Sequence, residues 1–272
     1  LTDKAIDYIK EADSNNEPFF MYLSYTAPHH PMHAKESDLA RVQHVPIKSG
    51  KKGDWRRIYC AMVQNMDDNI GRVLATLDEL KIEENTLVVF LSDNGGPKEH
   101  NGSNNYPLKG KKGNLWEGGI RVPFGVSWKG KIPAGQVSDT PVISLDLLPT
   151  FAAISGADQL GEIKTDGINL MPLLTRQVND LDERTFFWRR GGKKQAGLRD
   201  GKYKYYKTRG NGNEYLFEIG NDLSENNNLI DQYPEVADRM RKRYLKWEST
   251  LPELKIGLGA PASKEGENSE KH

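Results

Sequence analysis

The chain has 272 residues, enough for one large domain or one and a half. Its 38 Lys and Arg residues balance its 38 Asp and Glu residues, so no net charge attracts nucleic acid or an anionic membrane. A single cysteine excludes an internal disulfide and a thiolate metal cluster, and no apolar run reaches the length of about 18 residues that a membrane span needs.

The first residues have the pattern of a helix. Ala5, Ile6 and Ile9 are spaced for one apolar face, and no signal peptide precedes them. We therefore expect the chain to begin in the middle of a domain whose earlier strands lie outside it.

A continuous apolar run follows at residues 19–25 and predicts a buried strand. Immediately after it, His29, His30 and His33 lie in a loop that two prolines stiffen. Histidine can donate to an anionic oxygen or transfer a proton near neutral pH. The alternatives are simple packing or a fortuitous metal-binding surface, and the residues alone leave them open.

The next segment, residues 34–54, is basic and without periodicity, which predicts a surface loop. Residues 54–80 then have apolar side chains at intervals of three and four, which predicts a long helix. Asp67 and Asp68 are adjacent within it and point about 100° apart, which favours a solvated or capping role over a paired-carboxylate site.

Residues 86–96 read TLVVFLSDNGG, the pattern of a strand covered on both faces in a parallel sheet. Asp93 and Asn94 fall at its carboxyl end, where parallel α/β sheets place their ligands. Their oxygen atoms suit Ca²⁺ or Mg²⁺. The same residues are also good turn formers, so an Asx turn that closes the strand is the alternative.

A polar loop at residues 97–107 contains His100, which faces either a substrate or water. A Lys-Gly segment at 108–113 follows, in which Lys112 is a point charge suited to a tetrahedral anion, or else part of a solvated turn. Residues 124–128 predict a short strand, and residues 142–154 a helix.

The carboxyl-side region has the pattern of an antiparallel meander. Asp200-Gly201 is a strong hairpin signal between two of its runs. A helix at 234–251 follows, with one apolar face, and residues 260–272 read as a disordered tail. The strands are predicted at residues 185–190, 195–199, 202–206 and 215–219.

The order of these segments is more specific than any one of them. A strand ending in Ala-Pro-His-His-Pro, a helix, a strand ending in Ser-Asp-Asn-Gly-Gly, and Leu-Lys-Gly-Lys-Lys-Gly before Trp-Glu-Gly-Gly-Ile-Arg-Val-Pro resemble the carboxyl-side half of the sulfatase family. The resemblance covers residues 1–251, and the chain looks like a bacterial arylsulfatase of the kind related to arylsulfatase A and the N-acetylgalactosamine sulfatases.

The resemblance implies an alkaline-phosphatase-like α/β sandwich with a mostly parallel central sheet, joined to a small antiparallel four-stranded sheet with a packed helix. We expect the α/β part at residues 1–180, the small α+β subdomain at 181–255 and a tail at 256–272.

The resemblance also implies roles for individual residues. Asp93 and Asn94 match the family's Ca²⁺ ligands, with Mg²⁺ as the alternative ion. His29 matches the histidine that contacts the sulfate ester and helps to protonate the leaving oxygen, and Lys112 matches a lysine that binds sulfate oxygens. Further substrate contacts are expected from two more histidines, His33 and His100. The segment from Glu117 to Arg121 matches a structural turn.

The chain departs from the family in lacking a nucleophile. Sulfatases form formylglycine from a Cys/Ser-x-Pro/Ala-x-Arg motif, and Cys60 is followed by Ala-Met-Val-Gln instead. Ser37 begins the nearest serine pattern, but Leu39 stands where Pro or Ala is required. In the family this motif precedes the part that this chain resembles, so we expect the chain alone to be inactive.

The resemblance therefore predicts a Ca-dependent sulfuric ester hydrolase, an arylsulfatase or a carbohydrate sulfatase, whose substrate is a sulfated small molecule or glycan. Two alternatives are a phosphate mono- or diester hydrolase of the same superfamily and a non-catalytic fragment that needs a partner chain. Periplasmic or secreted localisation follows from the resemblance. Missing strands would leave an open sheet edge, so association with the remaining part or another chain is expected.

Overall fold

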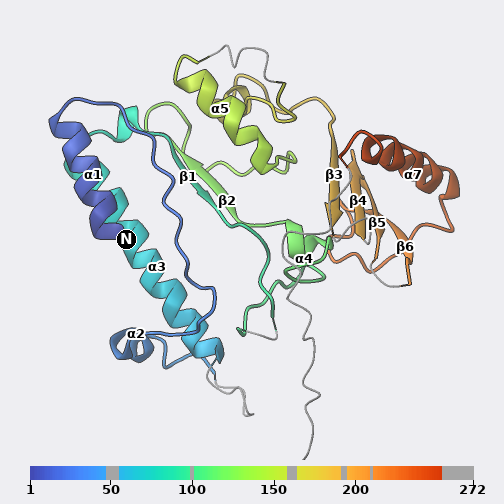
Figure 1. The fold of residues 1–272 in the computed structure, drawn as a ribbon, viewed down its shortest axis with the longest axis horizontal. Coiled ribbons are helices and arrows are strands. Elements are labelled where there is room, and N and C mark those ends of the chain that lie inside the picture. The colour runs from blue at the N-terminus through green and yellow to red at the C-terminus, as the bar shows by residue number, and fades with distance from the viewer. Residues whose placement is uncertain (47–54, 99–100, 158–163, 191–194, 209–210, 253–272) are drawn as a thin grey trace, which may run out of the picture. The chain divides into compact units, whose positions relative to one another are not determined.

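The computed structural model describes residues 1–46, 55–98, 101–157, 164–190, 195–208 and 211–252 (Figure 1). The chain divides into two compact units. Unit 1 consists of residues 1–105 and 121–182, and unit 2 of residues 106–120 and 183–272. The Lys-Gly segment, which the sequence placed in the α/β part, thus belongs to unit 2.

Two helices of unit 1 pack side by side, as Figure 1 shows. Helix α1 (Thr2–Ser14) buries Ala5, Ile9 and Ala12 on one face, which confirms the predicted amphipathic pattern. Helix α3 (Trp55–Glu79) buries Ala61 and Leu77. Both helices therefore form where their apolar side chains recur at helical spacing.

The predicted loop at residues 34–54 contains a short helix, α2 (Glu36–Arg41), so that prediction was wrong in part. The buried carboxylate of Asp38 accepts a hydrogen bond of 2.9 Å from Asn65 Nδ2 on α3. Arg41 pairs with Asp68, also on α3, which gives this aspartate a structural partner on the surface. Residues 47–54 lie outside the described part of the chain.

Strand β1 (Val88–Leu91) follows a 3₁₀ turn, η1 (Glu83–Asn85), and pairs antiparallel with β2 (Phe124–Ser127). The apolar run at residues 19–25 belongs to neither sheet of the described residues. A strand needs a neighbour to exchange backbone hydrogen bonds along its length. The predicted mostly parallel central sheet is therefore not confirmed.

Exposure along residues 19–25 nevertheless alternates from one residue to the next, as in an extended chain. Phe20 is 71% exposed and Tyr22 is 85% exposed. In β1, Phe90 and Leu91 are exposed as well. Unit 1 thus presents apolar side chains that a complete sandwich would cover.

Residues 142–154 form a 3₁₀ turn, η2 (Ser144–Asp146), and then helix α5 (Leu147–Ile154). Asp146 is fully buried and accepts hydrogen bonds of 3.0 Å from the backbone N–H groups of Ile143 and Ile168. This carboxylate thereby joins the start of α5 to the segment that leads into helix α6 (Met171–Leu174).

Unit 2 contains the predicted four-stranded antiparallel sheet, with strands in the order β3-β4-β5-β6. The short helix α4 (Glu117–Ile120) precedes the sheet in sequence, and α7 (Pro234–Glu248) follows it. Both the meander and the terminal helix are confirmed. The strand bounds are Thr185–Arg190 for β3, Gln195–Asp200 for β4, Tyr203–Lys207 for β5 and Glu214–Glu218 for β6.

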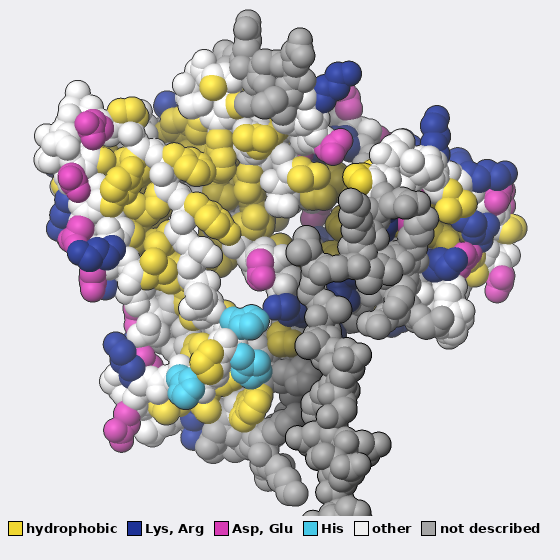
Figure 2. Space-filling view, in the orientation of Figure 1, with side chains coloured by type: hydrophobic (Ala, Val, Ile, Leu, Met, Phe, Trp, Pro, Cys, Tyr) yellow, Lys and Arg dark blue, Asp and Glu magenta, His cyan; other side chains and the backbone are white. Residues whose placement is uncertain are grey.

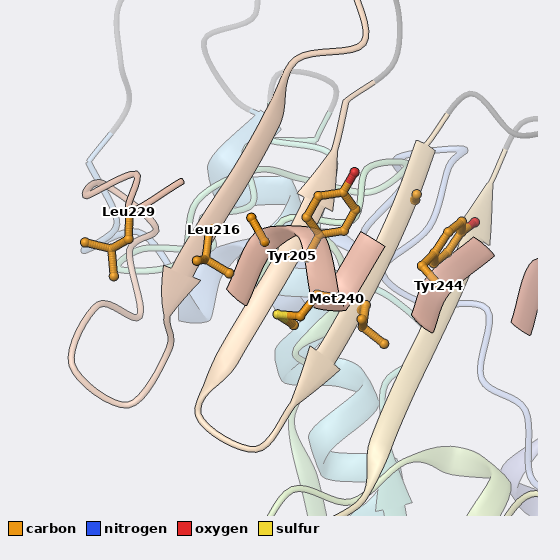
Figure 3. Close-up of a cluster of buried hydrophobic side chains, with 8 residues drawn as sticks. Tyr205, Leu216, Leu229, Met240 and Tyr244 are labelled. Carbon is orange, nitrogen blue, oxygen red and sulfur yellow. The ribbon is translucent and has the colours of Figure 1, made fainter. Parts of the chain in front are cut away.

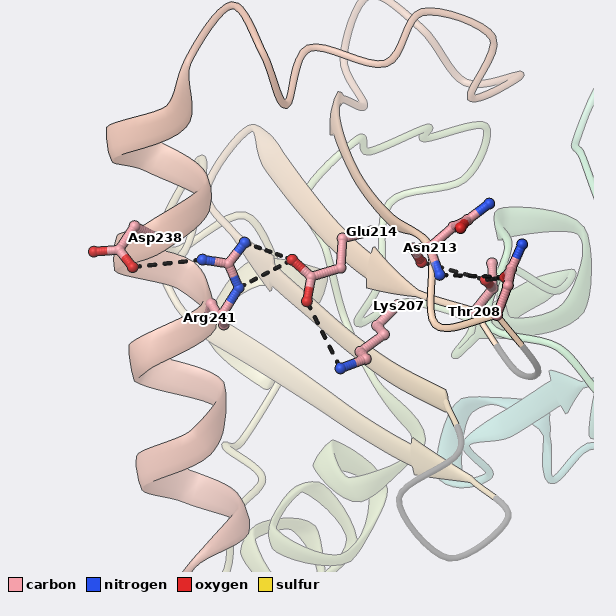
Figure 4. Close-up of polar contacts among 7 residues, drawn as sticks. Lys207, Thr208, Asn213, Glu214, Asp238 and Arg241 are labelled. Atoms are coloured by element: carbon pink, nitrogen blue, oxygen red, sulfur yellow. Dashed lines mark hydrogen bonds and ion pairs between the residues drawn. The ribbon is translucent and has the colours of Figure 1, made fainter.

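Helix α7 covers one face of this sheet. Met240 and Tyr244 pack on Tyr205, Leu216 and Leu229, and these side chains form the core in Figure 3. Polar contacts also join the helix to β6, where Arg241 Nε donates to Glu214 Oε2 at 3.0 Å (Figure 4). Successive strand residues point to opposite faces, so Lys204 and Tyr206 lie on the face away from α7.

No helix among the described residues is long and apolar enough to cross a membrane.

Candidate active site

His29 lies in a turn just after the extended run 19–25. Its backbone N–H donates to the Thr26 carbonyl at 2.9 Å, and its Nδ1 lies 2.9 Å from the His30 carbonyl oxygen. A carbonyl oxygen only accepts, so Nδ1 carries a proton. Nε2 is therefore the ring nitrogen that remains to exchange a proton or to bind an anionic oxygen.

The neighbouring histidines differ in their surroundings. His30 makes an edge-to-face contact with Trp55 at the start of α3, with ring centroids 5.2 Å apart. His33 is exposed. Histidine side chains gather on one part of the face that Figure 2 displays. His100 lies outside the described residues, so its predicted role stays a prediction.

Asp93 and Asn94 lie beyond the carboxyl end of β1, separated from it by Ser92. The backbone N–H of Ser92 continues the pairing with the β2 side, donating to the Pro123 carbonyl at 3.2 Å. Asp93 is exposed, and Asn94 Nδ2 donates to the Gly95 carbonyl at 3.2 Å. This bond uses the amide donor of Asn94 and leaves its Oδ1 as an acceptor.

The donor chemistry of this pair fits a hard cation, because both residues offer oxygen atoms. The number of ligands does not complete a site. Ca²⁺ takes about six to eight oxygen ligands, and the part of the chain that the structure describes contains no group of three or more His, Cys, Asp or Glu side chains placed to hold a metal. Any ion here needs ligands beyond Asp93 and Asn94.

Lys112 belongs to unit 2 and lies at the tip of a tight turn. Asn114 closes the turn twice: its backbone N–H donates to the Lys111 carbonyl at 3.1 Å, and its Oδ1 accepts from the Lys111 N–H at 3.0 Å. Gly113 has φ of 92°, which the third position of a type II turn requires. Lys112 is exposed, and no ion-pair partner is found for it within the described ranges.

Side chains of the sheet hold this turn through the carbonyl of Gly113. Gln195 Nε2 on β4 donates to it at 3.2 Å, and Arg190 at the end of β3 donates to it as well. The Tyr206 hydroxyl donates in turn to Gln195 Oε1 at 2.8 Å. Burial raises the pKa of the Tyr206 phenol to about 12, so the hydroxyl remains a donor at neutral pH.

A buried charge cluster contacts the segment that carries Lys112 on both sides of the turn. Lys204 Nζ lies 2.7 Å from Glu117 Oε1 and 2.8 Å from Glu225 Oε1. Glu225 Oε2 accepts from the Glu117 backbone N–H at 2.7 Å, and its backbone carbonyl accepts from Lys109 Nζ at 3.0 Å. The segment from Lys109 to Glu117 is thus fixed at both ends.

Helix α4 packs tightly on the same segment. A Cβ on Gly119 would lie 2.1 Å from the Asn114 carbonyl oxygen, and one on Gly118 would lie 2.5 Å from the Lys109 carbonyl oxygen. Only glycine fits at these positions, because backbone cannot move aside as a flexible side chain can. This packing agrees with the structural role predicted for residues 117–121.

The candidate residues thus come from both units. His29, His33, Asp93 and Asn94 belong to unit 1, and Lys112 belongs to unit 2. Sequence reasoning missed Gln195, which carries no motif. Its one sequence signal is a polar side chain directly before the short Ala-Gly-Leu run of β4.

Comparison with protein families identifies a family for the amino-terminal part of the chain. Residues 1–157 match the family model described as Sulfatase. That range contains every candidate residue proposed from the sequence.

Curated proteins similar to this chain include several sulfatases. Over 206 residues it is 35% identical to the N-acetylgalactosamine-6-sulfatase of Sus scrofa, which covers 74% of this chain and 36% of that protein. It is 38% identical over 181 residues to the steryl-sulfatase of Mus musculus, covering 64% and 27% respectively. A sulfatase of Formosa agariphila is 31% identical over 281 residues, covering 91% and 49%. The chain thus spans less than half the length of these relatives.

The fold of the chain is similar to that of solved structures. Ps i-CgsB in complex with k-i-k-neocarrahexaose has a TM-score of 0.79 at 34% identity, covering 90% of this chain and 53% of that one. The phosphonate monoester hydrolase SpPMH from Silicibacter pomeroyi has a TM-score of 0.52 at 19% identity, covering 75% and 42%, and shares the fold alone.

Proposed function

The chain belongs to the sulfatase family, whose solved members have the alkaline-phosphatase-like fold, and we propose from this that the intact protein is a sulfuric ester hydrolase. The substrate is an aryl sulfate or a sulfated carbohydrate. A carbohydrate is favoured by the similarity to an N-acetylgalactosamine-6-sulfatase and to a structure in complex with a neocarrahexaose. The expected location is the periplasm or the extracellular medium.

The observation that carries the proposal is the family match over residues 1–157, because it includes all the candidate residues. Their local chemistry supports the same reaction. His29 has one ring nitrogen engaged and the other left for proton exchange, and Lys112 is an exposed ammonium on a fixed turn.

In this proposal His29 and Lys112 act on opposite ends of the ester. Lys112 binds the sulfate oxygens as a positive point charge. The protonated imidazole of His29 donates its Nε2 proton to the bridging oxygen as the S–O bond breaks, so the alcohol leaves neutral. His33 and His100 are proposed to contact the rest of the substrate.

Two further groups complete the site in this proposal. The nucleophile, a formylglycine in this family, would come from a part of the protein outside this chain, since Cys60 lies within α3 and no maturation motif surrounds it. Asp93 and Asn94 would hold Ca²⁺, or Mg²⁺, with other ligands. When bound, the cation would neutralise negative charge on the sulfate group.

The test uses the full-length protein expressed with its formylglycine-generating enzyme. Sulfate release is measured from 4-nitrophenyl sulfate and from a panel of sulfated mono- and oligosaccharides, with a Lys112→Ala variant as the matched control. Hydrolysis that depends on Lys112 would support the proposal. If the full-length protein hydrolyses none of these sulfate esters, the proposal is overturned.

Phosphate mono- or diester hydrolysis is the second candidate, because a metal and a lysine suit any tetrahedral anion and the fold is shared with a phosphonate monoester hydrolase. The same assay with 4-nitrophenyl phosphate and bis(4-nitrophenyl) phosphate distinguishes the two. A Cys/Ser-x-Pro/Ala-x-Arg motif in the preceding sequence favours sulfate, whereas a threonine at the nucleophile position favours phosphate.

The exposed apolar side chains of unit 1 are proposed to be covered by the remainder of the protein. Phe20, Tyr22, Phe90 and Leu91 are exposed, and apolar side chains are visible on unit 1 in Figure 2. The relatives are more than twice as long as the matched part, which leaves ample chain to cover them. Without that cover, this surface favours self-association or a partner chain.

A further inference from the structure

The face of the unit 2 sheet away from α7 carries an unusual set of buried polar side chains. Gln195 is 3% exposed, Lys204 0% and Tyr206 2%. Buried polar groups are retained where they have hydrogen-bond partners. The partners of these three side chains include the segment that carries Lys112.

Gln195 contacts the Lys112 turn at Gly113, the residue after Lys112. The Gly113 carbonyl accepts from Gln195 Nε2 at 3.2 Å, and the Tyr206 hydroxyl donates to Gln195 Oε1 at 2.8 Å. The backbone of Leu115 also acts on the Tyr206 hydroxyl and lowers its pKa, against the effect of burial. The Gln195 amide is thereby held in one orientation, with its N–H toward the turn.

Tyr206 also packs on the segment through its ring. Trp116 lies edge to face with Tyr206, with ring centroids 4.5 Å apart, and Lys109 Nζ lies 4.2 Å from the centroid of the Trp116 ring. The segment therefore has both polar and apolar contacts with the sheet. A backbone fixed in this way restricts the region that the flexible Lys112 side chain can reach.

We propose that Gln195 and Tyr206 are positioning residues for the sulfate ester reaction: they hold the Lys112 turn so that its ammonium meets the sulfate oxygens. This inference rests on the proposed function. Neither residue touches the substrate: Gln195 acts through the Gly113 carbonyl, and Tyr206 acts through Gln195 and Trp116. The small C-terminal sheet thus has a role in substrate binding as well as in folding.

The adjacent residue Tyr205 provides a matched control. It is buried to the same degree, 1% exposed, but faces α7, where its hydroxyl interacts with Glu214 and Arg241. Tyr205→Phe and Tyr206→Phe therefore each remove one buried hydroxyl from the same strand. Only Tyr206→Phe removes the hydrogen bond to Gln195, the side chain that donates to the Lys112 turn at Gly113.

The experiment compares Tyr206→Phe, Gln195→Met and Tyr205→Phe in the mature full-length enzyme. Because Lys112 binds the sulfate group in the ground state and in the transition state alike, we expect a higher KM for 4-nitrophenyl sulfate, by about tenfold, with a smaller change in kcat. The inhibition constant of inorganic sulfate should rise in parallel. Tyr205→Phe should leave all three values within about twofold of wild type.

A second measurement does not depend on activity. Amide hydrogen exchange of residues 110–115 should accelerate in Tyr206→Phe and Gln195→Met, and it should stay at the wild-type rate in Tyr205→Phe. If the wild type hydrolyses no sulfate ester, the proposed function fails, while the exchange rates still test the positioning contacts. Unchanged KM, sulfate inhibition and exchange in both variants would overturn the inference.

Discussion

Lys204 and Glu225 form an ion pair in which Nζ lies 2.8 Å from Oε1, and neither side chain is exposed to solvent. Glu117 shares the same ammonium group at 2.7 Å, so one cation serves two carboxylates. Glu225 Oε1 has no directed hydrogen bond, so the ammonium charge is its main stabilising partner. Removing the lysine would leave two buried carboxylates without a cation.

Replacing this lysine should therefore destabilise unit 2 strongly. We expect Lys204→Met to lower the free energy of unfolding by about 3–5 kcal/mol, because breaking a buried pair leaves uncompensated charge. Lys202→Met is the matched control, since Lys202 is exposed and pairs with Glu218 at 3.0 Å on the surface. Urea unfolding of both variants measures the difference, and similar midpoints would contradict the prediction.

The stability of the cluster should also depend on pH through Glu225. Burial raises the pKa of the Glu225 carboxyl above its usual 4.5, although the Lys204 ammonium acts in the opposite direction. Below pH 4.5 the carboxyl is protonated in the folded and the unfolded states, and its favourable contribution is fully present. As pH rises through the raised folded-state pKa, the folded state must ionise a buried group and that contribution is lost.

A Glu225→Gln variant isolates this effect, because glutamine cannot ionise. The free energy of unfolding of wild type relative to Glu225→Gln should fall as pH increases from below 4.5 toward neutrality. Unfolding measured at a series of pH values, with both proteins in the same buffers, gives this difference directly. A difference that is constant with pH, or rises, would contradict the assigned direction.

Elements whose partners lie close in sequence were predictable, because the residues that determine them lie within a short stretch of chain. Each strand of the unit 2 sheet pairs with its neighbour in sequence, and Asp200-Gly201 signals one of the hairpins. The amphipathic spacing of α1, α3 and α7 is equally visible. Where an element has a distant partner, sequence was insufficient: α2 packs on α3, and its Asp38 bonds to Asn65, 27 positions away.

The same limit applies to the candidate site. Motifs identified His29, Asp93, Asn94 and Lys112, because each motif is a short run of residues. The residues that hold the Lys112 turn have no such motif, since Gln195 contacts Gly113 across 82 positions of chain. Residues 19–25 have the composition of a strand, but pairing needs a neighbour, and the described part of the chain supplies none.

The role of His29 as a proton donor predicts a dependence on the leaving group. An alkoxide leaving from a sugar sulfate needs protonation much more than a nitrophenolate does. We expect His29→Ala to lower kcat for a sugar sulfate by about 10²–10⁴-fold, and for 4-nitrophenyl sulfate much less. Kinetics of the mature full-length enzyme with both substrates provide the test, with exposed His44→Ala as control. Equal losses on both substrates would exclude proton donation by His29.

The proposed cation site predicts a dependence on added Ca²⁺. Chelation should abolish activity of the full-length enzyme, and Ca²⁺ should restore it. Asp93→Ala should raise the Ca²⁺ concentration needed for half-maximal activity by at least about tenfold, as expected when a charged ligand is lost. Asp67→Ala, which removes an exposed carboxylate from α3, should not alter it. Calorimetric titration with Ca²⁺ adds a measurement that does not rely on turnover; equal affinity in Asp93→Ala would remove Asp93 from the site.

The last prediction concerns residues 1–272 on their own. The chain retains His29, Asp93, Asn94 and Lys112, but it has no formylglycine motif. Catalytic groups that act as a unit lose nearly all of their effect when the nucleophile is removed, with losses on the order of 10⁶-fold in comparable cases. We therefore expect the purified chain to show no turnover of 4-nitrophenyl sulfate, while the full-length protein prepared in parallel is active. Turnover by the chain with a stoichiometric burst of nitrophenol would show that it contains its own nucleophile, and Cys60, its only cysteine, would then be the first residue to replace.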